Sequence, residues 1–153
     1  MGVLTALAIL AGLVVVHEAG HFFAATWQGI RVSSFSIGFG PVVWSWRSPR
    51  SGTEFALSAV PLGGYVRMLD EREGPVAASE RHLAFNTQSL WARAAIVAAG
   101  PLANLLLAVV LVALASRVLE RLLYSRLYGA VELEQVLLTI GLIFMSVAVA
   151  RLI

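Results

Sequence analysis

Five consecutive residues near the N-terminus, His17, Glu18, Ala19, Gly20 and His21, form an HExxH motif. On a helix this spacing puts both imidazoles on one face, where they can reach a single Zn²⁺. The glutamate beside them can act as a general base on water at the metal. The sequence therefore offers His17 and His21 as metal ligands, and Glu18 as the catalytic base of a hydrolysis.

The motif lies inside a long apolar stretch. Residues 3–16 carry no charge, and the apolar run 22–25 follows the second histidine. Ionisable groups within a membrane-length apolar segment are costly to bury, so they usually mark a functional site. A chance HExxH is the alternative, and this setting favours the metal site over it.

Composition assigns the chain to a broad class. Hydrophobic residues make up 59% of its 153 residues and charged residues only 13%, against roughly 25% charged in soluble domains. The chain is therefore predicted to be an integral membrane protein. Cysteine is absent, which excludes a disulfide framework, a thiolate nucleophile and a cysteine metal site. Its arginines are scattered without a basic stripe, so no nucleic-acid partner is expected.

The predicted fold is mostly α, a polytopic membrane protein with two to three transmembrane helices. The first span covers about residues 3–25, and it is expected to be retained because it lacks the positive start of a signal peptide. The second covers 94–116, which is free of charge. Residues 117–135 are amphipathic. The last apolar run, 136–150, rises only roughly 22 Å, short of a full crossing.

A membrane-associated β-hairpin is predicted between the first two spans, over residues 42–60. Two strand-like runs there flank a turn signal at 48–52. The glycine-containing segment 61–66 is expected to end the hairpin, and the 60–66 region is expected to border a polar cavity. The surrounding loop, 28–93, contains seven arginines, so it is expected to be cytoplasmic.

Several longer segments resemble those of one family in the same order. Besides the HExxH motif they are RVSSFSIGFGPVVW from Arg31, GTEFALSAVPLGGYVRMLDE from Gly52 and HLAFNTQSLWARAAIVAAGPLANLLLA from His82. Up to about residue 113 the chain resembles site-2 proteases, and more closely the regulator-of-sigma-E type of intramembrane zinc metalloprotease.

The resemblance implies a Zn²⁺-dependent endopeptidase of the bacterial inner membrane that cuts transmembrane helices of regulatory membrane proteins in the lipid bilayer. It implies His17 and His21 as zinc ligands and Glu18 as base, and a hairpin that presents substrate as an added strand. It also implies a third ligand, an Asp in a later membrane segment. The sequence has a single Asp, Asp70, outside that motif, so we expect little or no proteolysis from this chain alone.

The C-terminal part suggests a different origin. Residues 117–152 resemble a segment of a branched-chain amino-acid transporter permease. The expected organisation is therefore the N-terminal half of a site-2 protease core over 1–116, joined to a foreign or truncated segment over 117–153. Two alternative functions remain open, a transporter-permease fragment and a non-catalytic membrane binding module.

Other candidate residues have plainer interpretations. His82 and Asp70 are expected to be solvated in the loop, with Asp70 as a stand-in ligand the alternative. Asn104 either hydrogen-bonds near the site or joins two helices. The hairpin either binds substrate or caps the helices. The four tryptophans are expected to be interfacial anchors.

Overall fold

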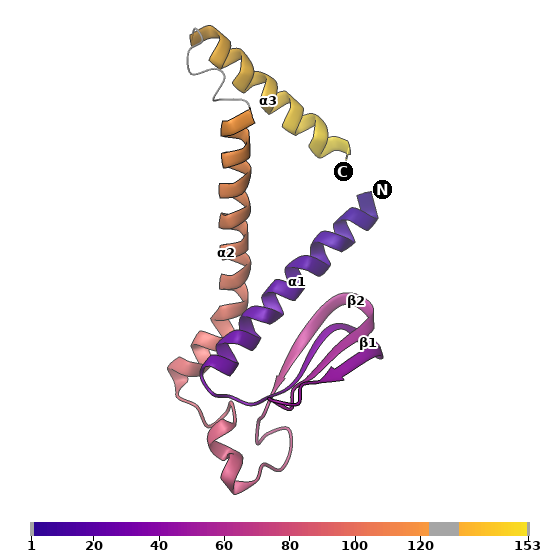
Figure 1. Ribbon diagram of the computed structural model, residues 1–153, viewed down its shortest axis with the longest axis vertical. Helices are drawn as coiled ribbons and strands as arrows, with labels where there is room; N and C mark the ends of the chain where they lie inside the picture. Colours follow the sequence, from indigo (N-terminus) through magenta and orange to yellow (C-terminus); the bar gives the residue numbers. More distant parts are fainter. Residues whose placement is uncertain (1, 123–131, 153) are drawn as a thin grey trace. The chain divides into compact units, whose positions relative to one another are not determined.

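The computed structural model describes residues 2–122 and 132–152 (Figure 1). Its elements run in the order α1 (Gly2–Trp27), β1 (Val32–Arg47), β2 (Glu54–Met68), the 3-10 helix η1 (Ala78–Leu83), α2 (Leu90–Leu122) and α3 (Glu132–Leu152). Residues 7–106 form one compact unit; a second unit contains the first six residues and those from 107 onwards. All candidate site residues lie in the first unit.

Among the described residues, three helices are long and apolar enough to cross a membrane: Gly2–Trp27, Leu90–Leu122 and Leu133–Arg151. Apolar side chains along them are widely exposed, as a lipid-facing surface requires. The predicted class, a mostly helical membrane protein with two to three spans and a hairpin between the first two, is confirmed.

The helices extend beyond the predicted apolar runs. The last helix covers Glu132–Leu152, not only 136–150, because a helix continues through polar residues such as Gln135 that an apolar count leaves out. Residues 117–122 belong to α2 rather than to a separate amphipathic segment. The rest of that predicted segment, 123–131, lies outside the described residues.

The hairpin is longer than predicted. Its strands cover Val32–Arg47 and Glu54–Met68 instead of 42–60, so residues 61–66, expected to end the strand, continue it. The turn at 48–52 is as predicted, with Gly52 at φ +71°. The strands continue because residues 32–37 gain partners on 64–68, which the local alternation pattern does not reveal.

The two antiparallel strands bend so that each contributes twice to the sheet. Residues 34–37 pair with both 54–57 and 64–67, while 44–47 pair with 54–57. The segments therefore lie in the order 64–67, 34–37, 54–57, 44–47. Gly38 lies at the bend with φ +87°, and a Cβ there would meet the Val60 carbonyl oxygen at 2.7 Å. Glycine alone fits both the left-handed backbone and this close approach.

A small core fixes the end of α1 against the sheet and α2. It consists of Ala25, Ile30, Val32 and Ile96, all nearly inaccessible. Beside it, the Phe22 ring of α1 makes edge contacts with Phe35 and Phe55 of the sheet. Because Phe22 follows His21 directly, these ring contacts fix the position of the HExxH turn against the sheet.

Candidate metal centre

The two motif histidines converge on one point. His17 and His21 lie one helical turn apart on α1 and are both half-buried. Their Nε2 atoms are 3.2 Å apart, and their rings meet edge to face with centroids 4.8 Å apart. The spacing read from the sequence thus brings two imidazole nitrogens into contact on a helix of membrane-spanning length.

The tautomer of His21 is fixed by the helix opposite. His21 Nδ1 lies 2.7 Å from the carbonyl oxygen of Ile96 on α2. A carbonyl oxygen can only accept a hydrogen bond, so Nδ1 carries the proton and donates. In neutral His21 the lone pair is then on Nε2, directed toward His17. A backbone carbonyl in this position is one of the partners found behind metal-ligating histidines.

Gly100 of α2 leaves room for the imidazoles. A Cβ atom at this position would lie 2.8 Å from His17 Nε2, 2.6 Å from His21 Cε1 and closer still to His21 Nε2. In protein structures a Cβ atom essentially never lies within 3.0 Å of a non-bonded heavy atom. The bare backbone of Gly100 therefore forms one wall of the space on which the two Nε2 atoms converge.

Gly20 allows α1 and α2 to approach closely beside the histidines. A Cβ there would meet the Ala99 carbonyl oxygen at 2.5 Å and the Ala103 Cβ at 2.8 Å. Small residues at a crossing let membrane helices pack backbone to backbone. Gly20, one of the two unspecified positions of HExxH, must therefore lack a side chain for α1 and α2 to lie this close.

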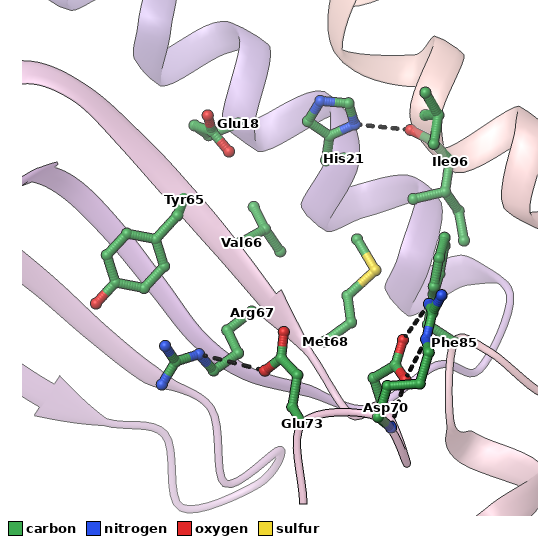
Figure 2. Close-up of a pocket in the computed structure, with 12 residues that line it drawn as sticks. Glu18, His21, Tyr65, Val66, Arg67, Met68, Asp70, Glu73, Phe85 and Ile96 are labelled. Carbon is green, nitrogen blue, oxygen red and sulfur yellow. Dashed lines mark hydrogen bonds and ion pairs between the residues drawn. The ribbon is translucent and has the colours of Figure 1, made fainter.

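Glu18 and His21 line a cavity of about 530 Å³, whose other walls come from β2, α2 and the following loop (Figure 2). Tyr65 and Val66 on β2 face it, in agreement with the expectation that the 60–66 region borders a cavity. Next to them, a Cβ at Gly64 would lie 3.1 Å from Glu18 Cγ. The half-buried Glu18 carboxylate is thus held between its own helix and the sheet, beside the cavity.

Charged residues form the outer end of the cavity. Arg67 belongs to β2, and Asp70, Arg72 and Glu73 belong to the loop that follows it. Arg72 bonds both carboxylate oxygens of Asp70, at 3.0 and 2.6 Å, and this hydrogen bonding to the guanidinium holds the pKa of Asp70 below its ordinary value. The Asp70 side chain is only 10% exposed, so it is less solvated than expected. Its negative charge is paired with the Arg72 guanidinium.

The donor set meets part of the requirement for Zn²⁺. Two nitrogens at the usual Zn–N distance on one tetrahedral ion lie about 3.3 Å apart, close to the 3.2 Å observed between the Nε2 atoms. Because His21 carries its proton on Nδ1, its Nε2 lone pair is free to bind a metal ion. Within residues 2–122 and 132–152, however, no group of three or more His, Cys, Asp or Glu side chains could hold a metal. The described residues thus bring together two nitrogen donors, fewer than a complete zinc site requires.

Sequence reasoning brought together some of these features and missed others. It placed His82 apart in the loop, and that residue is exposed at the end of η1. It predicted neither the contact of Gly64 with Glu18 nor the roles of Gly100 and the Ile96 carbonyl, because these contacts depend on how α2 and the sheet dock on α1. The one available signal was the GPLAN sequence at 100–104, in which a glycine lies one turn before a polar residue.

Comparisons with known proteins agree with the geometry. The chain matches the model of peptidase family M50 over residues 5–150. A "Putative zinc metalloprotease" of Xylella fastidiosa (strain Temecula1) is 61% identical over 99 residues, which are 65% of this chain and 22% of that protein. The "Regulator of sigma-E protease RseP" of Escherichia coli (strain K12) is 53% identical over 100 residues, with the same two shares.

A "Putative zinc metalloprotease" of Vibrio cholerae is 53% identical over 97 residues, 63% of this chain and 21% of that protein. The chain thus spans about a fifth of the length of the curated relatives it matches. The family match covers nearly all of the described residues. The chain belongs to peptidase family M50, the family of the site-2 proteases.

Proposed function

We propose that this chain supplies the zinc-binding helix and the general base of an intramembrane metalloendopeptidase. The observation that carries the proposal is the pair of Nε2 atoms 3.2 Å apart, beside a glutamate that opens to a cavity, on a helix of membrane-spanning length. Membership of family M50, whose relatives include proteins named as zinc metalloproteases, supports it.

In this proposal His17 and His21 hold the metal, and Glu18 moves the proton. Zinc, when bound, lowers the pKa of water toward ~7 and polarises the scissile carbonyl. The Glu18 carboxylate takes the proton of the attacking water and returns it to the leaving amine. The His21 Nδ1–H bond to Ile96 keeps that ring oriented throughout. Two histidines fill half of a tetrahedral zinc shell, so further ligands would have to come from water or from residues other than His17 and His21.

The substrate in this proposal is a transmembrane segment of another membrane protein. A helix must unwind before its peptide bonds can be cut, and an extended segment can add to a sheet edge through main-chain hydrogen bonds. Residues 64–67 form one edge of the sheet and continue into the cavity wall beside Glu18. An added strand there would bring its carbonyls toward the histidines.

The proposal extends to organisation and location. Residues 1–116 act as the membrane core of the protease, in a multi-pass protein of the bacterial inner membrane with loop 28–93 in the cytoplasm. The seven arginines of that loop support this orientation. In this orientation the charged end of the cavity, around Asp70 and Arg72, faces the cytoplasm, so water can enter there.

Zinc content tests the metal site. The detergent-purified chain, equilibrated with excess zinc and washed, is expected to hold close to one zinc per chain by elemental mass spectrometry. His17→Ala and His21→Ala should each remove nearly all of it, because one remaining imidazole is a weak ligand. His82→Ala is the matched control and should leave it unchanged. Equal zinc in wild type and His21→Ala, or none in either, would contradict the proposal.

A further inference from the structure

Asn104 of α2 lies behind His17 as Ile96 lies behind His21. Its Nδ2 atom is 3.4 Å from His17 Nδ1. Its other side-chain atom, Oδ1, is buried and has no hydrogen-bond partner among the described residues. A buried acceptor without a donor is unfavourable, so the amide is satisfied at one end only.

The orientation of this amide sets the tautomer of His17. With Nδ2 toward the ring, Asn104 donates to His17 Nδ1, so the ring proton is on Nε2 and bonds the lone pair of His21 Nε2. With the amide turned over, Oδ1 accepts from His17 Nδ1–H, and the lone pair is on His17 Nε2. Only the second arrangement presents two lone pairs to one cation, because a protonated nitrogen cannot ligate.

We propose that Asn104 is a positioning residue whose amide turns over when metal binds, holding the His17 proton on Nδ1 and freeing Nε2 as a ligand. This rests on the proposed metal site. After the turn, Oδ1 accepts from His17 Nδ1–H, and Nδ2 takes the position that Oδ1 leaves. His17 then has a carbonyl acceptor behind it, matching the bond from His21 Nδ1 to Ile96. Both histidines would be oriented by α2, within one turn of Gly100.

The test reads the tautomers directly, with and without zinc. The full chain in detergent, labelled with ¹⁵N-histidine, is studied at about pH 9, where imidazoles are neutral; signals are assigned with the three His→Ala variants. In the metal-free wild type we expect the His17 proton on Nε2, and with zinc on Nδ1. Asn104→Asp, which can only accept, should hold the proton on Nδ1 even without metal.

Asn104→Leu, close in size but without polar atoms, completes the comparison. Its zinc affinity should fall about 10- to 100-fold, the usual effect of losing a partner behind a ligand, while the His21 tautomer and the helical circular dichroism stay unchanged. The inference is overturned if metal-free Asn104→Asp keeps the proton on Nε2, or if Asn104→Leu binds zinc as tightly as wild type. Should the wild type bind no zinc, the proposed function fails, and the metal-free comparison still decides the role of Asn104.

Discussion

Gly100→Ala is expected to weaken zinc binding strongly while leaving the protein folded. The added methyl would lie within 2.8 Å of His17 Nε2 and nearer to His21 Nε2, so one imidazole must rotate out of the shared position. Because the Nε2 atoms then no longer converge, we expect affinity to fall by about 100-fold or more, at least as much as losing a partner behind a ligand. Isothermal titration with zinc measures it.

The fold should tolerate this change. Alanine is the better helix former by roughly 1 kcal/mol, which opposes the local crowding, so the melting temperature should move little. Gly141→Ala on α3 is the control, because a Cβ there meets nothing within 4 Å, and it should bind zinc as wild type does. Wild-type affinity in Gly100→Ala would show that metal does not bind between the two histidines.

Gly20→Leu is expected to separate α1 from α2 and destabilise the protein. Its side chain would run into the Ala99 backbone carbonyl and the Ala103 methyl, neither of which can move without shifting a helix. Overpacking of this kind costs about 1–3 kcal/mol. Parting the helices also lengthens the His21 Nδ1 bond to Ile96. We expect a clearly lower melting temperature in detergent together with weaker zinc binding.

Gly12→Leu provides a control on the same helix. A Cβ at Gly12 meets nothing within 4 Å and the residue is exposed, so a leucine there should face lipid or detergent without loss of stability. The contrast separates helix contact from the general effect of replacing a helical glycine. If both variants melt alike, the close crossing at Gly20 is not what holds α1 to α2.

Local sequence patterns predicted most of the helices and the hairpin turn. The features they did not predict depend on contacts between segments that are distant in the chain. The four-residue spacing of His17 and His21 is a helix property, so their convergence followed from the sequence alone. The extra strand length at 32–41 and 61–68 did not, because those residues are held by partners distant in the chain. The same holds for Gly100 and the Ile96 carbonyl, which acquire their roles only when α2 meets α1.

The loop gives a second example. Asp70 was expected to be solvated, since neighbouring charges suggested an open, polar segment. It pairs instead with Arg72 and lines the same cavity as Glu18. Composition predicts where charge is frequent, but which charges pair depends on the turn geometry between Asp70 and Arg72, only two residues apart.

We propose that Glu18, His17 and His21 form the hydrolytic half of a membrane protease, and exchanging this segment into a relative tests that proposal. The matched 100 residues of this chain replace their counterparts in the Escherichia coli relative, to which they are 53% identical. Cleavage of a transmembrane test substrate that the parent cleaves is then measured in liposomes.

We expect the exchanged protein to cleave at a rate within an order of magnitude of the parent. The same protein with Glu18→Gln should retain zinc but lose at least about 100-fold in rate, the usual contribution of a general base. The assignment would be contradicted if the exchanged protein folds and binds zinc but never cleaves, or if it cleaves equally well with Gln at position 18. The first result would indicate a module that binds substrates without cutting them.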